Sequence, residues 1–355
     1  MKNLYLFIVI IIVIISFVKC GSNNEEKDEK KNKNDVVNQN DSSGIISSTP
    51  YEVKGDESFH LAYKFKIGKS FKYRLTTISS TKQSITSDST INNNFDQKVT
   101  RILTFNTISM DRDTIANLRC TVTDIDVNRN IDGKTLNYKS GEDLDSTKLN
   151  NFGEYAVLIN NPFNLKVTTH GKIIEIYGVG KIVDKLVQMT KMNKSMNNEQ
   201  KENFINRLKE NFLKPMLNQF FRELPDKELK IGGNWTNSIP PATVMAFKLS
   251  YNNIFSLDNI EKVKNEKIAV IAGKSNISVE GKTKQVNRGV EYNFEKPTVS
   301  AGGKLFFNMD KGLLYKSDTG TNLEINYKYQ MIGPNGLVKA STKRKVTNKS
   351  IAELL

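Results

Sequence analysis

The sequence holds few histidines and cysteines, the side chains that most often serve as zinc ligands or as an activated nucleophile with its base. Its only histidines are His60 and His170, and its only cysteines are Cys20 and Cys120. A structural zinc site needs about four Cys or His ligands, and a nucleophilic cysteine or serine needs a base beside it. These four residues do not readily supply either set. The sequence therefore predicts a protein that is not an enzyme and that binds neither a metal ion nor another cofactor.

Two short motifs resemble ligand-binding loops, but each lacks residues on which binding depends. The segment Asp124–Asn128 begins like a calcium loop, yet Arg129 stands at the glycine position and Thr135 at the position of the bidentate glutamate. The segment Gly178–Gly180 precedes a helical pattern as a phosphate-binding loop would, but Val183 replaces the third glycine. A strand with alternating residues explains the first motif, and a strand-to-helix corner explains the second.

The remaining candidate for function is an apolar stripe on the helical segment Val179–Leu224. The spacing predicts two amphipathic helices, the second beginning near Asn197 with a capping box to Gln200 and ending before Pro225. Pro215 lies inside this second helix, so we expect a kink or break there. Such a stripe usually packs on a sheet. The alternative is that it lines a pocket for an apolar ligand, with these lining residues: Phe204, Leu208, Phe212, Met216 and Phe220.

An apolar run at the start of the chain predicts export. The run from Leu4 to Val18 is shorter than the roughly 18 residues that span a membrane, and polar residues follow it, which is typical of a signal peptide over residues 1–20. Cys20 at its end, before Gly-Ser, resembles the lipobox of bacterial lipoproteins. In those proteins the cysteine becomes the lipid-bearing first residue. Because Lys19 stands where a small residue is usual, an uncleaved anchor or an ordinary signal peptide stays open as an alternative.

Composition limits the partners. Residues 21–58 are polar and poor in apolar side chains, so we expect a disordered tether. The formal net charge is +14, but the lysines alternate with apolar residues instead of forming a dense patch with aromatic rings, so no nucleic-acid partner is predicted. The expected partners are a membrane, through a lipid on Cys20, and an apolar ligand or another protein of the envelope.

Most of the chain alternates apolar and polar residues, as antiparallel strands with one buried face do. Three landmarks of the first half recur in the same order in the second half, which predicts an internal duplication. The matched landmarks are Phe65–Phe71 with Leu229–Trp235, Gly133–Thr135 with Gly281–Thr283, and hairpin turns at Gly171 and Gly312. The expected organisation is a first β repeat over 59–178, a helical segment over 179–226 and a second β repeat over 227–355.

These elements predict an α+β fold that is predominantly antiparallel β. We expect two related curved sheets, each resembling a half-barrel, with the helical segment packed on their apolar faces. Glycine corners at Gly68 and Gly232 would let the sheets curl. Cys120 shares a strand face with Leu118 and Val122, so we expect it to be a core residue and not a reactive thiol.

Several of these motifs together resemble an uncharacterised family of bacterial lipoproteins, a domain of unknown function common in the Bacteroidota. The resemblance covers about Leu61 to Val346, and the motifs that carry it are Lys66-Ile67-Gly68, Thr168–Lys172, Leu224-Pro225 and Ile231–Trp235. It implies an exported protein, lipid-anchored in the outer membrane or at the cell surface, and it implies no catalytic residue. The expected function is structural or partner-binding. The alternative is a carrier of a lipid or other apolar ligand between curved sheet and helix, while a hydrolase lacks a nucleophile with its base.

Overall fold

The computed structural model describes residues 48–53, 55–112, 114–190, 197–333 and 336–355. The expected signal peptide, Cys20 and most of the expected tether lie outside the described residues. The strands are β1 (Thr49–Pro50), β2 (Ser70–Thr86), β3 (Thr90–Asp111), β4 (Ile115–Ile131), β5 (Lys134–Lys139), β6 (Phe163–Thr168), β7 (Ile173–Tyr177), β8 (Asn234–Val244), β9 (Phe247–Val263), β10 (Glu266–Gly281), β11 (Lys284–Asn287), β12 (Val290–Phe294), β13 (Thr298–Asn308), β14 (Leu313–Gly333) and β15 (Gly336–Leu354). The helices are α1 (Ser146–Ala156), α2 (Gly180–Met189), α3 (Asn198–Leu208), the π-helical turn η3 (Lys209–Leu213) and α4 (Lys214–Leu217).

The strands form one curved antiparallel sheet, which confirms the predicted α+β class with its curved antiparallel strands. Its central path runs β1-β9-β10-β13-β14-β15-β2-β3-β4-β6-β7. The expectation of two separate sheets is wrong, because β15 pairs with β2 along its length, from Ser341 with Thr86 to Leu354 with Tyr73. Alternation reports which face of a strand is buried, but it does not report which edges meet. Here the last strand closes the gap between the two halves.

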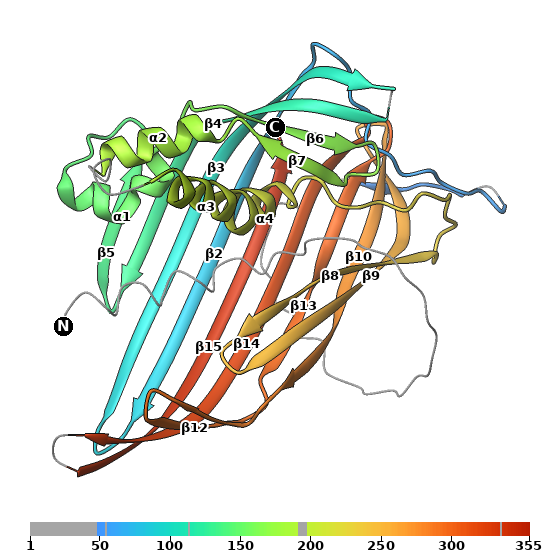
Figure 1. Ribbon diagram of the computed structural model, residues 1–355. Helices are drawn as coiled ribbons and strands as arrows, with labels where there is room; N and C mark the ends of the chain where they lie inside the picture. The colour runs from blue at the N-terminus through green and yellow to red at the C-terminus, as the bar shows by residue number, and fades with distance from the viewer. Residues whose placement is uncertain (1–47, 54, 113, 191–196, 334–335) are drawn as a thin grey trace.

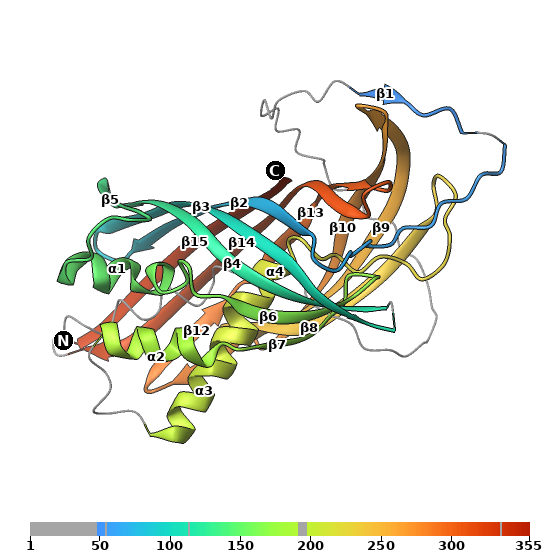
Figure 2. The same ribbon diagram turned by 90° about the horizontal axis from the view of Figure 1, so that it is seen from above.

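The helices lie together over one end of the sheet, on the inner side of its curve (Figures 1 and 2). Asn197 caps α3 as predicted: its side chain accepts from the Gln200 amide at 2.8 Å, and the Gln200 side chain accepts from the Asn197 amide at 2.9 Å. A disturbance of the helix at Pro215, where a kink or break was predicted, is also present, and the backbone stays helical through it. The turn η3 interrupts the regular helix, and Pro215 then lies in the first turn of α4, where no backbone donor is required.

Two local features concern where helices begin and end. The polar stretch 140–151 contains the start of α1, with the Asp145 side chain accepting from the Lys148 amide at 2.8 Å. Phe152 and Tyr155, which α1 buries, provide the tertiary contacts that a polar sequence window does not reveal. The second helix ends at Leu217, before Pro225 as predicted, and the following residues turn into the core.

The end of the expected tether contacts the sheet in the described residues, while the tether over residues 21–58 stays a prediction. Thr49 and Pro50 pair with Lys262 and Glu261 of β9, and the Tyr51 amide donates to the Ile260 carbonyl at 3.1 Å. The Tyr51 ring is partly buried against the apolar core, and the Lys267 ammonium lies 4.5 Å from its centroid.

The two halves begin in similar ways. Phe71 of β2 stacks on Phe105 with ring centroids 5.3 Å apart, and Trp235 of β8 stacks on Phe255 at the same 5.3 Å. Each aromatic residue follows a glycine turn, at Gly68 and Gly232, and each faces the inside of the curve. The internal duplication and the domain boundaries drawn from it stay predictions.

Candidate ligand-binding site

The register of the sheet assigns each strand residue to one of two faces. Directly paired residues of antiparallel strands share a face. Tyr73 pairs with Leu103, and Leu103 pairs with Val122; all three are buried on the inner face of the curve. The same pairing, followed from strand to strand, places Asn348, Val346 and Leu323 on this inner face too.

The inner face carries two separate apolar clusters. The first lies under the helices, where the Phe220 ring is 4.8 Å from that of Tyr73 and 5.5 Å from that of Phe105. Cys120 is buried in this cluster as predicted, and burial raises the pKa of its thiol well above the usual value. The second cluster lies farther along the strands and consists of Val244, Leu249, Tyr251, Leu323, Ile325 and Val346.

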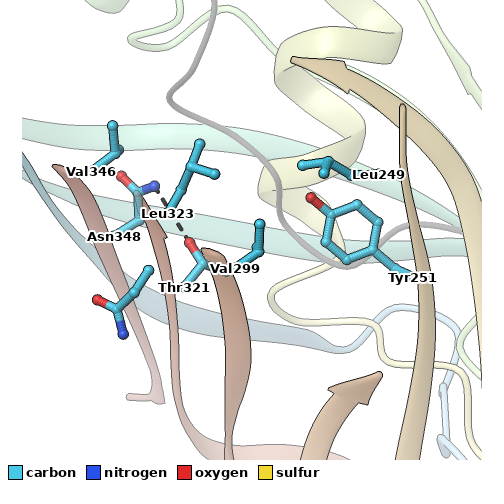
Figure 3. Close-up of a pocket in the computed structure, with 8 residues that line it drawn as sticks. Leu249, Tyr251, Val299, Thr321, Leu323, Val346 and Asn348 are labelled. Carbon is cyan, nitrogen blue, oxygen red and sulfur yellow. Dashed lines mark hydrogen bonds between the residues drawn. The ribbon is translucent and has the colours of Figure 1, made fainter. Parts of the chain in front are cut away.

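A cavity opens within the second cluster, where the sheet curls back so that β9 faces β14 and β15 (Figure 3). Its volume is about 20 Å³, which is room for roughly one water molecule. Leu249 and Tyr251 form one wall, and residues of β13, β14 and β15 form the other: Val299, Thr321, Asn322, Leu323, Val346 and Asn348. The two walls meet through side chains, because none of the described backbone pairings joins β9 to β14 or β15.

Several polar atoms on the walls of this curve are buried without a hydrogen-bond partner in the described part of the chain. They include the Tyr251 hydroxyl, the Oδ1 atom of Asn348 and both side-chain polar atoms of Asn253, a residue only 1% exposed. Burial raises the pKa of Tyr251 to about 12, so this hydroxyl keeps its proton. An unpaired buried polar group costs about 1–3 kcal/mol, and native interiors leave few of them. These atoms therefore call for partners from water or from a bound molecule.

Four polar side chains beside the first cluster form a polar belt near α1: Arg101, Arg129, Gln97 and Glu154. The buried Arg101 guanidinium lies over the rings of Tyr155 and Phe212, 5.5 and 5.8 Å from their centroids, and burial lowers its pKa. Arg129 donates from Nε to the Oε1 atom of Gln97 at 2.9 Å. Partial burial raises the pKa of the Glu154 carboxyl, and the positive charges of Arg129 and Arg101 act against that rise. The polar belt therefore contains a negative charge of its own, the Glu154 carboxylate, close to its two arginines.

With this geometry established, comparison with known proteins places the chain in a family. The sequence profile of a family of unknown function, DUF6263, matches residues 113–314, which is more than half of the chain. The protein belongs to this family. No curated protein matches it. The expected membership of a family of unknown function is confirmed.

Solved structures match the chain only remotely. Lipovitellin is 11% identical, with a TM-score of 0.37 over 80% of this chain and 25% of its own, so this chain spans about a quarter of lipovitellin. An outer membrane channel of Pseudomonas putida F1 is 7% identical over 82% of this chain and 97% of its own, with a TM-score of 0.17. The OccK5 protein of Pseudomonas aeruginosa is 7% identical over 80% and 98%, with a TM-score of 0.19. Scores this low carry no functional argument.

The five helical residues predicted to line a ligand site do not line the cavity between β9 and β14–β15. Phe220 and Met216 are buried in the first cluster. Phe204, Leu208 and Phe212 are half-buried and pack against that cluster, and α3 buries none of its residues fully. Their role in ligand binding stays a prediction. The cavity residues escaped notice in the sequence because alternation shows that a strand has an inner face, but not which other strand that face meets.

The two histidines, far apart in sequence, are neighbours in the fold. Their ring centroids are 6.0 Å apart, and the Nδ1 atom of His170 lies 3.5 Å from an oxygen of the exposed Asp226. Across the described ranges, no three His, Cys, Asp or Glu side chains cluster closely enough to hold a metal ion. No helix among the described residues has the length and apolar character needed to cross a membrane. That the protein is not an enzyme stays a prediction.

Proposed function

We propose that the protein is a non-enzymatic binder of an apolar ligand, such as a lipid or acyl chain, held inside the curve of its sheet. The observation that carries the proposal is the cavity between β9 and β14–β15, with apolar walls and buried polar atoms that have no hydrogen-bond partner among the described residues. Sites for small apolar ligands have this composition, with mostly hydrophobic walls and a few polar groups that orient the ligand.

Binding requires the two walls to separate, because 20 Å³ does not hold an acyl chain. The contacts to be replaced are apolar, between Leu249 and Tyr251 on one wall and Leu323 and Val346 on the other. An acyl chain inserted there substitutes for those contacts without breaking a backbone hydrogen bond between the walls. Among the described strands β8 pairs only with β9, which leaves that side of the curve free to move outward.

The test is uptake of a neutral apolar probe by the full chain. We expect the methyl ester of cis-parinaric acid to gain fluorescence on binding, and Val299→Phe to weaken binding about tenfold or more because the larger ring occupies the cavity. Solvent extraction and mass spectrometry of the purified protein should also reveal a co-purifying lipid. The matched control is Ile78→Phe on the outer face of β2, which should bind as the wild type does.

The outcome of this titration also decides between two functions. A structural or partner-binding role is the second candidate, because large apolar side chains are exposed on three neighbouring hairpins: Ile91, Val286, Ile332 and Leu337. Ile332 is 88% exposed. Exposed apolar surface of this kind marks sites of association. A wild-type protein that carries no lipid and takes up no probe would overturn the carrier proposal and favour this second role.

We also propose that a lipid on Cys20 anchors the protein in the cell envelope, in the outer membrane or at the cell surface. The support is the apolar run Leu4–Val18 followed by Cys20-Gly21-Ser22. Cys20→Ala is expected to move the protein out of the membrane fraction, because the acylated side chain is lost. Retention in that fraction with an unprocessed N-terminus would show an uncleaved anchor, and a soluble wild-type protein would show an ordinary signal peptide.

A further inference from the structure

Charged residues are divided unequally between the two faces of the sheet. The outer face of β15 carries Lys339, Lys343, Lys345 and Lys349, and the outer face of β2 carries Lys72, Arg74 and Lys82. On the inner face of seven strands, the only charged side chains are Arg101 and Arg344, with no lysine, aspartate or glutamate. The inner positions compared are every second residue of Phe247–Leu257, Ile271–Val279, Val299–Leu305, Ser317–Tyr329, Ala340–Ala352, Tyr73–Ile85 and Ile91–Leu103.

The two inner arginines differ in what surrounds them. Arg101 is buried in the polar belt, donates to the Thr77 hydroxyl at 3.3 Å and lies near the Glu154 carboxylate. Arg344 belongs to the lower part of the curve, where it pairs with Ile325 on one side and Gln83 on the other. Its Nε atom is buried without a hydrogen-bond partner, and no carboxylate in the described part of the chain makes an ion pair with it.

Arg344 lies beside the cavity. It is two residues from Val346 on the same face of β15, which separates their Cα atoms by about 7 Å. A group of aromatic rings lies on the other side of Arg344. In this group the centroid of the Tyr327 ring is 5.5 Å from that of Phe294 and 6.1 Å from that of Tyr292. The Arg344 side chain is half-buried and has no counter-ion among the described residues, so this part of the curve favours an anionic partner.

We propose that the ligand is an anionic amphiphile, whose acidic group pairs with the Arg344 guanidinium while its chain lies between β9 and β14–β15. This inference rests on the proposed apolar site and names the chemical class that the site selects. Carboxylates and phosphate monoesters share the required chemistry, since both present two oxygens to the planar fork of a guanidinium. The 7 Å spacing places the first few carbons of the chain over Val346 and Leu323.

The proposal predicts a dependence on head-group charge that one arginine controls. The full chain is loaded with the methyl ester of cis-parinaric acid, and oleate, oleyl phosphate and oleyl alcohol are compared as competitors. In the wild type we expect at least one of the two anions to displace the probe about tenfold better than the alcohol. Arg344→Gln should abolish that advantage and leave the alcohol and the ester unaffected, while Arg344→Lys should keep part of it. The anion whose displacement of the probe weakens most in Arg344→Gln identifies the head group as carboxylate or phosphate.

Lys345→Gln is the matched control, because it removes one positive charge from the next residue of the same strand on the outer face. It should leave every competitor unchanged. Equal displacement by both anions and the alcohol in the wild type would overturn the inference and leave the apolar site standing. If Lys345→Gln and Arg344→Gln reduced the advantage of the anions over the alcohol equally, the inference would also be overturned, since general surface charge would then be responsible. Failure of the wild type to bind the ester would refute the proposed function itself.

Discussion

Phe220→Ala is expected to lower the free energy of unfolding by about 3–5 kcal/mol, the usual cost of truncating a fully buried phenylalanine. The Phe220 ring is completely buried and joins the end of the helical segment to the sheet, through Tyr73 and Phe105. Its removal leaves a cavity that rigid strands on one side cannot close. Urea denaturation followed by circular dichroism measures the loss, which is a large fraction of the stability of an ordinary domain.

Phe204→Ala provides the comparison for that measurement. Phe204 lies on α3 and is only half-buried, so we expect its truncation to cost about 1 kcal/mol or less. Both variants should still take up the apolar probe under conditions where they are folded. If folded Phe220→Ala instead loses the probe while Val299→Phe keeps it, the ligand lies against the helices and the cavity proposal is wrong.

Gly171→Ala is expected to destabilise the protein by about 2–5 kcal/mol. Gly171 has a φ of +84°, a conformation that costs an alanine roughly 1–2 kcal/mol. An added Cβ would also collide with the Arg222 carbonyl oxygen and lie 2.6 Å from the Tyr63 ring. Overpacking of this kind costs a further 1–3 kcal/mol or so. The Tyr63 hydroxyl cannot easily give way, because it donates to the Phe220 carbonyl at 3.0 Å and accepts from the Arg222 amide at 2.8 Å.

Gly68→Ala separates the two causes of that loss. Gly68 has a similar φ of +76°, but an added Cβ would meet no atom within 4 Å. Only the backbone strain remains, so its melting temperature should fall by clearly less than that of Gly171→Ala. Equal shifts in the two variants would mean that the contact between the hairpin turn and the 220–222 segment is soft, contrary to its buried hydrogen bonds.

Local rules explain the part of the fold that was predictable from sequence. Asn197 and Gln200 form a capping box because both partners lie within one helical turn, and Pro215 disturbs the helix through atoms of its own ring and its missing donor. The alternation around Tyr73 and Leu103 marks one buried face because side chains of a strand project to opposite sides. Cys120 follows from the same alternation. These features depend on near neighbours, so the sequence by itself determined them.

Tertiary structure alone decided how those faces meet. The pairing of β15 with β2 turns two expected sheets into one, and the curl of that sheet brings Tyr251 opposite Val346, although nearly a hundred residues separate them. The helix α1 forms from a polar stretch because Phe152 and Tyr155 find buried contacts there. Arg344 could not be told from the outer lysines by charge or composition. Its place inside the curve follows from the register of β15 against its neighbours, and register is set by contacts between distant strands, which no local window contains.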